Sequence, residues 1–198
     1  MTAFITPCCT NGAERSIRRL LVALLWLPAW LLANDTALRH AEIKLQDDAY
    51  VVNAEIDVEL NPRLTEAVNH GVSLYFVTEL TVERPRWYWF DEVVIERRLN
   101  YRISYHAITR SYRLSLGNFH QSFDTLDDAL RIMRRVRNWE VAERAALIDG
   151  ESYEASLRFR LDTAQLPKPF QVTAIGSSDW NLSTDWLKWT FLAGPLSQ

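Results

Sequence analysis

The side chains that most often carry catalysis or bind metals are scattered along this sequence. Its four histidines stand far apart: His40, His70, His106 and His120. Zinc sites combine closely spaced histidines and cysteines, and the two cysteines, Cys8 and Cys9, lie far from any histidine, so the sequence predicts no metal and no cofactor. It contains no Gly-x-Ser-x-Gly elbow, no phosphate-binding glycine loop and no His-Glu-x-x-His. We therefore expect a protein that is not an enzyme, unless the fold gathers polar side chains in a pocket.

The segment from Arg84 to Glu92, RPRWYWFDE, is the densest concentration of residues typical of a binding surface. Arginines interleaved with aromatic rings can stack on sugars or anchor a protein interface. Alternatively, Trp87 and Trp89 point to one side of a strand end and close the hydrophobic core. The candidate partner or ligand surface consists of Arg84, Arg86, Trp87, Trp89 and Asp91.

Two further clusters have both a structural and a functional interpretation. Three tryptophans near the C-terminus are expected to seal an edge or end of a sheet, with carbohydrate or peptide binding as the alternative: Trp180, Trp186 and Trp189. Four arginines crowd the last turns of a predicted helix: Arg131, Arg134, Arg135 and Arg137. Basic residues in the last turns complement the helix dipole, so we expect a solvated helix face there. A patch for anionic lipids or an acidic partner is the alternative.

The clusters named above would be positioned by strands, because apolar and polar residues alternate over most of the chain. The alternation covers residues 41–45, 52–60, 72–82, 93–105, 112–116 and 153–161. A period of two places one face of each strand on a core and the other in water, which is typical of antiparallel sheets. We expect a hairpin that turns near residues 106–109. If 52–60 and 153–161 are neighbours, Glu55 and Asp57 would pair with Arg158 and Arg160.

Two segments are predicted to be short helices. Asn61-Pro62 opens the first, which runs to Asn69 and stops before Gly71, because proline suits a first turn and glycine the position past an end. Thr125 opens the second with a capping-box pattern, followed by apolar residues at helical spacing. Many strands with two short helices predict a mainly β fold, an antiparallel β-sandwich of immunoglobulin-like or related type. A barrel is the second choice.

The N-terminal region predicts export. Arg18 and Arg19 precede the uncharged run 20–33, which ends in Ala33, as in a secretory signal peptide. We expect cleavage between Ala33 and Asn34, leaving residues 34–198 as one β-rich domain. An uncleaved membrane anchor is the alternative, although a spanning helix needs about 20 apolar residues. The net charge of the whole chain is −3 and the leader is basic, so the remainder is more acidic and a nucleic-acid partner is not expected.

Four stretches together carry a resemblance to a known family. They are RPRWYWFDE (84–92), YRISYHAITRSYRLS (101–115), LPKPFQV (166–172) and DWNLSTDW (179–186). In this order they resemble the proteobacterial DUF4390 family, a domain of unknown function, over residues 41–189. The resemblance implies a signal or anchor segment, and genes that often lie beside those of a nitrogen-regulation-type membrane sensor kinase and its response regulator. It implies no catalytic or binding residues.

These observations predict an exported envelope protein, periplasmic if the leader is cleaved and anchored to the inner membrane if it is not. The function we expect is that of a non-enzymatic protein-binding or accessory module, with a membrane sensor histidine kinase as the candidate partner. Contact with the membrane is expected only through an uncleaved N-terminal segment. The alternative is a periplasmic small-ligand or glycan-binding domain that uses the segment 84–92.

Overall fold

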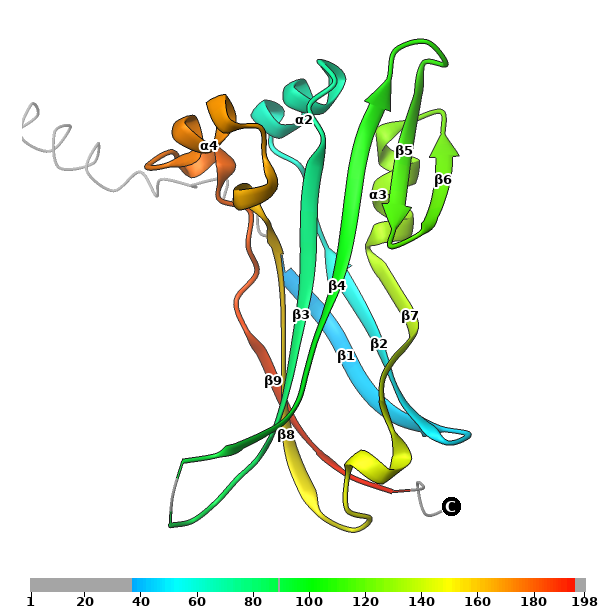
Figure 1. The fold of residues 1–198 in the computed structure, drawn as a ribbon, viewed down its shortest axis with the longest axis vertical. Helices are drawn as coiled ribbons and strands as arrows, with labels where there is room; N and C mark the ends of the chain where they lie inside the picture. Colours follow the sequence, from blue (N-terminus) through cyan, green and yellow to red (C-terminus); the bar gives the residue numbers. More distant parts are fainter. Residues whose placement is uncertain (1–36, 89, 195–198) are drawn as a thin grey trace, which may run out of the picture. The chain divides into compact units, whose positions relative to one another are not determined.

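Two antiparallel sheets make up most of the computed structural model, which describes residues 37–88 and 90–194 of the chain. The smaller sheet has the order β1-β2-β7 and the larger β6-β5-β4-β3-β8-β9 (Figure 1). The smaller sheet consists of β1 (Ala37–Gln46), β2 (Ala49–Asp57) and β7 (Arg135–Glu143). The larger consists of β3 (Leu74–Arg84), β4 (Glu92–His106), β5 (Ser111–Leu116), β6 (Phe119–Phe123), β8 (Ser152–Leu161) and β9 (Leu187–Leu192). The predicted leader 1–33 and the cleavage site at Ala33 and Asn34 lie outside the described residues.

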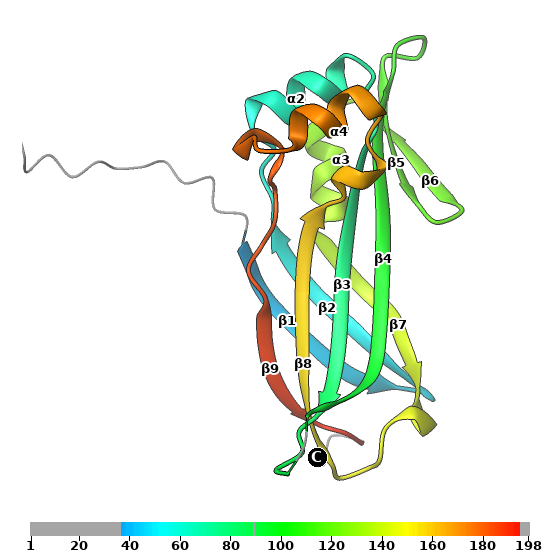
Figure 2. The same cartoon turned by 60° about the vertical axis from the view of Figure 1, so that its left-hand side comes forward.

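The predicted β-sandwich is confirmed. Each sheet turns its apolar face to the other, and Figure 2 shows β1, β2 and β7 crossing behind the longer strands. Both strand orders are open, with β6 and β9 at the edges of the larger sheet, so the barrel alternative is wrong. The division into three and six strands also differs from the four-plus-three arrangement of immunoglobulin constant domains. The protein therefore shares with those domains the packing of two antiparallel sheets, but not the number of strands in each sheet.

The core forms where the alternating strands place their apolar side chains between the sheets. On β3, Leu74, Phe76 and Leu80 are fully buried. The Phe76 ring stacks on that of Phe159 from the neighbouring β8, with ring centroids 5.5 Å apart. Burial of each such side chain contributes about 1.5–3 kcal/mol to the stability of the fold. Because these side chains are buried only in the observed β3–β8 register, the core stabilises the same register as the strand pairing.

Both predicted helices are present, with the predicted caps. Helix α2 (Pro62–Asn69) is capped by Asn61, whose Oδ1 accepts a hydrogen bond from the Leu64 N–H at 2.9 Å. It ends before Gly71, which adopts φ 85°, a conformation that favours glycine. Helix α3 (Leu126–Met133) is capped by Thr125. A third helix, α4 (Lys168–Ala174), was not predicted, because it is short and none of its residues is fully buried.

Several sequence expectations need correction. Arg135 and Arg137 do not belong to the end of a helix: α3 is capped at Arg134, and β7 begins at once by pairing with β2. Strands β6, β7 and β9 were not predicted. The proposed pairing of Glu55 with Arg158 is wrong, because β2 and β8 belong to different sheets. The hairpin turn between β4 and β5 lies where it was predicted.

Candidate functional site

The loop between β3 and β4 carries the predicted candidate surface. The two strands pair as far as Arg84 and Glu92, and the residues between them form the tip of the hairpin. Arg84 and Arg86 both donate hydrogen bonds to the same carboxylate oxygen, Oε2 of Glu92. The Arg86 backbone N–H donates to Oδ1 of Asp91 at 3.1 Å. The charged residues of the segment therefore hold its base together.

These arginine contacts also set the electrostatics of the loop. Hydrogen bonds from Arg84 and Arg86, helped by their charges, hold the pKa of the Glu92 carboxyl below its ordinary value. Glu92 is therefore ionised at neutral pH and offsets part of the arginine charge. What the hairpin presents to solvent is mainly aromatic.

The aromatic side chains of this loop that the structure describes are exposed to solvent. Trp87 is 95 % exposed, Tyr88 and Phe90 are also exposed, and the Trp87 and Tyr88 rings meet edge to face at 5.3 Å. The core interpretation is therefore wrong for Trp87, because the loop lies beyond the last paired residues and projects past the strands (Figure 1). Trp89 lies outside the described residues. We name this surface, residues 84–88 and 90–92, the hairpin tip.

The second aromatic group is used mainly for packing. Trp180 is 2 % exposed, and its ring lies 5.6 Å from that of Phe170 on α4. Trp189 lies half-buried on the edge strand β9. Trp186 is partly exposed and lies under the Arg158 guanidinium, 4.5 Å from its ring centroid. Sealing of an edge and an end is thus the role of Trp180 and Trp189.

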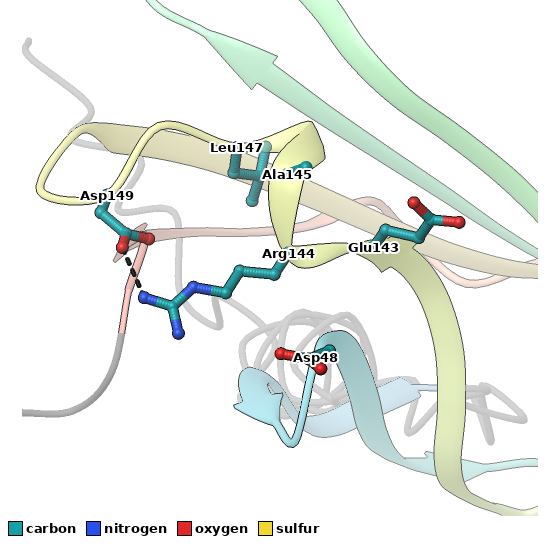
Figure 3. Close-up of a pocket in the computed structure, with 6 residues that line it drawn as sticks. All are labelled: Asp48, Glu143, Arg144, Ala145, Leu147 and Asp149. Carbon is teal, nitrogen blue, oxygen red and sulfur yellow. Dashed lines mark hydrogen bonds and ion pairs between the residues drawn. The ribbon is translucent and has the colours of Figure 1, made fainter.

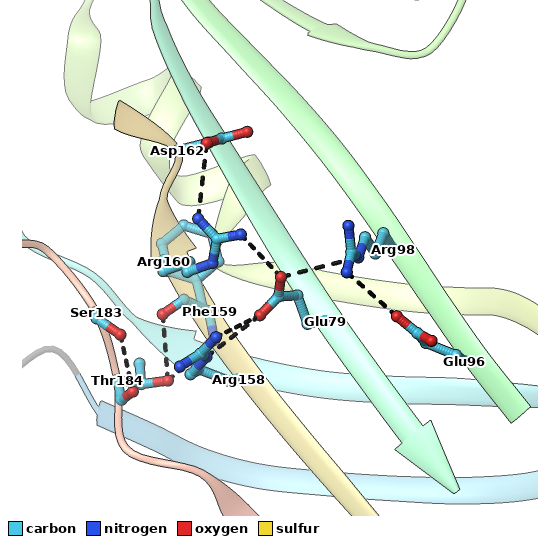
Figure 4. A network of polar contacts seen from close by, with 9 residues as sticks. All are labelled: Glu79, Glu96, Arg98, Arg158, Phe159, Arg160, Asp162, Ser183 and Thr184. Atoms are coloured by element: carbon cyan, nitrogen blue, oxygen red, sulfur yellow. Dashed lines mark hydrogen bonds and ion pairs between the residues drawn. The ribbon is translucent and has the colours of Figure 1, made fainter. Parts of the chain in front are cut away.

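A polar network on the outer face of the larger sheet was not anticipated (Figure 4). Glu79 of β3 is only 8 % exposed and lies between Arg158 and Arg160 of β8. Arg158 Nη2 donates to Oε2 at 2.7 Å, and Arg160 Nη2 donates to Oε1 at 2.9 Å. Burial acts to raise the pKa of Glu79, but the arginine hydrogen bonds and charges outweigh it, so the pKa lies below the ordinary value. The network clamps β3 to β8.

A polar pocket of about 540 Å³ adjoins this network. Arg158 and Arg160 form one wall, and Ser177, Ser178 and Asn181 are among the residues of the other. Both guanidiniums bind Glu79, and Arg160 Nη1 also lies 3.7 Å from Asp162 Oδ1, so two carboxylates compensate the two cations. The arrangement is that of a structural cross-strand clamp.

A second pocket, of about 500 Å³, lies where the β1–β2 turn approaches the segment after β7 (Figure 3). Asp48, Glu143 and Asp149 give it acidic character, and Arg144 Nη2 donates to Asp149 Oδ2 at 2.7 Å. No group of three or more His, Cys, Asp or Glu side chains among the described residues is placed to hold a metal ion. The pocket pairs no nucleophile with a base.

A largely apolar groove of about 530 Å³ lies between β7 and the inner face of β4, β5 and β6. Its floor is made of Leu99, Tyr101, Leu114 and Leu116, and Phe119 stands at the β5–β6 turn. Sequence reasoning missed this groove, because β6 and β7 were not recognised as strands. We call it the β7 groove.

Comparison with known families adds one finding: a family model for DUF4390, a domain of unknown function, matches residues 33–190. The chain belongs to the DUF4390 family. The match confirms the resemblance and spans both the hairpin tip and the β7 groove. Searches of curated proteins and of solved structures gave no match.

Among the described residues of the DUF4390 domain, no helix is long and apolar enough to span a bilayer. The family model covers the β-sandwich and the exposed aromatic residues of the hairpin tip.

Proposed function

We propose that this DUF4390 protein is an exported, non-enzymatic binding module of the cell envelope that docks a protein partner through the hairpin tip. The observation that carries the proposal is the 95 % exposure of Trp87 on a loop whose arginines are already paired. An exposed tryptophan is a large apolar surface left in water, and aromatic side chains of this kind are frequent anchors of protein interfaces.

The shape of the hairpin tip favours a protein partner over a glycan. Sugar-binding sites are concave, whereas Trp87 lines none of the three pockets described above and stands at the end of a projecting loop. A projecting aromatic loop fits a recess on another protein. The glycan alternative would need a concave wall beside Trp87.

The envelope address rests on the sequence, and the candidate partner rests on what the family resemblance implies. The basic leader and its apolar run support export, and the family's gene neighbourhood supports a membrane sensor histidine kinase as the partner. A binding module held at or near the inner membrane would reach the sensor domain of such a kinase with the hairpin tip.

The test is a pull-down from detergent-solubilised, crosslinked envelopes with three versions of the full chain: wild type, Trp87→Ala and Ile108→Ala. Ile108 is a matched control, because it is 92 % exposed at the turn of a different hairpin. We expect the kinase to be recovered with wild type and Ile108→Ala and lost with Trp87→Ala. Recovery of the protein alone, or equal recovery with all three, would overturn the proposal.

Two further measurements separate the parts of the proposal. Cell fractionation tests the envelope address, which fails if the protein stays in the cytoplasm. Kinase output in a deletion strain tests the named partner, which fails if signalling is unchanged. Quenching of tryptophan fluorescence by soluble envelope glycans, abolished by Trp87→Ala, would support the glycan alternative instead.

A further inference from the structure

The inner face of the larger sheet is incompletely covered. The larger sheet has six strands and the smaller only three, so the smaller sheet ends at β7 while β5 and β6 continue beyond it. Helix α3 contacts β5, β6 and β7. Phe119, at the β5–β6 turn, nevertheless stays 77 % exposed, and Leu116 and Ile132 are exposed as well. Apolar side chains that line the β7 groove are thus left in water.

The inner face of the larger sheet is also uncovered at Arg97 on β4. It lies directly opposite Leu80 in the β3–β4 register, and directly opposite residues of an antiparallel pair project to the same face. Leu80 is fully buried in the core, yet Arg97 is exposed on that same face. The core side of β4 is therefore uncovered beside Leu99, which lines the groove.

The wall of the groove is the edge strand β7. It pairs with β2 on one side and with no strand of the described residues on the other. Strands within a sheet lie about 4.8 Å apart and packed sheets about 10 Å apart. One more strand beside β7 would extend the smaller sheet over the exposed apolar residues of β5 and β6. This is the geometry of strand addition, in which backbone hydrogen bonds bind an extended peptide.

A bulge limits where such a strand can pair. Asn138 adopts φ 49° and its backbone N–H donates to Oδ1 of Asn53 at 2.9 Å, where the β2–β7 register shifts. Bulges on edge strands hinder indiscriminate edge-to-edge pairing. The register shifts a second time between Glu140 and Ala142. Pairing beside the groove is therefore confined to short stretches of β7, which would make the register of an incoming strand specific.

The charges around the groove indicate the chemistry of the occupant. Arg135 and Arg137 line the groove, are more than half exposed, and share one carboxylate, Glu55, at 4.0 and 3.7 Å. Among the described residues Arg97 forms no ion pair and donates only to the Glu96 backbone carbonyl. The groove also contains Glu140, so its Arg135 end is the basic one. Basic character here stands out, because the whole chain is acidic.

We propose that the β7 groove binds an extended, acidic segment of a partner protein as an added strand. Apolar residues of the segment cover Leu116 and Phe119, and its outward acidic residues face Arg135 and Arg137. A second copy of this chain fits less well, because pairing β7 with β7 would bring the same arginines together. The chain's own leader is also basic, with Arg15, Arg18 and Arg19. The site is independent of the hairpin tip.

The test is a selection of phage-displayed random 12-residue peptides on the full-length wild-type protein. We expect the enriched peptides to alternate acidic and apolar residues. Synthetic versions are then titrated by fluorescence anisotropy, and backbone amide exchange locates them. Binding should slow exchange within 135–143 and leave the hairpin tip unchanged. Methylation of the peptide's backbone nitrogens, which removes strand hydrogen bonds, should weaken binding at least tenfold.

Matched variants separate the groove from general charge effects. The double variant Arg135→Glu, Arg137→Glu should lose at least tenfold in affinity. Arg113→Glu, on the outer face of β5, should keep the wild-type affinity, as should Trp87→Ala. Absence of enrichment, enriched peptides without acidic residues, or binding that leaves exchange in 135–143 unchanged would overturn the proposal. So would a wild-type dimer in solution that Arg135→Glu, Arg137→Glu abolishes, or peptide displacement by phosphatidylglycerol vesicles.

Discussion

Arg158 of β8 lies directly opposite Glu79 of β3 and binds its carboxylate through two nitrogens, Nε at 3.3 Å and Nη2 at 2.7 Å. The two residues are 79 positions apart in sequence. Arg160 binds the other oxygen of the same carboxylate. One nearly buried acid thus holds together two neighbouring inner strands of the larger sheet, β3 and β8, which makes it the first residue to test.

Replacing Glu79 by Gln should destabilise the domain by about 2–3 kcal/mol, because two half-buried guanidiniums lose the charge that compensates them. The measurement is the free energy of unfolding in urea. Glu96→Gln is the control, since Glu96 is exposed and should change stability by less than about 0.5 kcal/mol. Equal effects of the two substitutions would contradict the structural role of Glu79.

The stability contributed by Glu79 should depend on pH. Its pKa in the folded domain lies below the ordinary value of 4.5, so the unfolded chain binds the proton more tightly. The contribution is therefore complete above pH 4.5 and is lost as the pH falls through the lower, folded-state pKa. Urea unfolding at a series of pH values should show the gap between wild type and Glu79→Gln narrowing below pH 4.5. A gap that widens on acidification would contradict the assignment.

Two tryptophans should respond in opposite ways to replacement by alanine. Trp87→Ala should change the free energy of unfolding by less than about 0.5 kcal/mol, because its side chain is almost wholly exposed. Trp180→Ala should cost about 3–5 kcal/mol, because it leaves a cavity beside Phe170. Urea denaturation of both variants is the measurement. A large loss for Trp87→Ala would show that the hairpin tip is packed in solution.

The cap of α3 should be worth about 1 kcal/mol. Thr125 Oγ1 accepts a hydrogen bond from the Asp128 N–H at 3.2 Å and donates to the Asp128 carboxylate at 2.6 Å. Thr125→Ala removes both contacts, whereas Thr125→Ser keeps the hydroxyl. Thermal unfolding should therefore show a lower Tm for the alanine variant and a Tm close to wild type for the serine variant. Equal losses would mean that the methyl group, and not the cap, matters.

The protein recovered from the envelope should begin at Asn34. The apolar run is short for a membrane span, and Ala33 supplies the small residue that signal cleavage requires. Intact-mass measurement of the purified protein checks this. An intact leader together with recovery in the membrane fraction would establish the anchored alternative.

Local patterns in the sequence were enough to predict the elements with regular alternation or clear caps. Residues 52–60 and 153–161 alternate strictly, so their faces follow from the period of two whichever strands they pair with. Asn61 and Thr125 cap their helices through hydrogen bonds to residues three positions away, which sequence spacing reveals. Strand β7 escaped prediction, because its alternation is broken at the Asn138 bulge and its first residues resemble a helix end.

The sequence by itself determined the β-rich class, the two capped helices, the hairpin between β4 and β5, and the family. Only the tertiary structure decided which strands are neighbours, and therefore that Arg158 binds Glu79 and that Glu55 faces Arg135. It also decided that Trp87 is exposed and that β7 borders an uncovered groove. The physical reason is that strand pairing and burial depend on residues far apart in the chain, whereas alternation and capping are properties of adjacent residues.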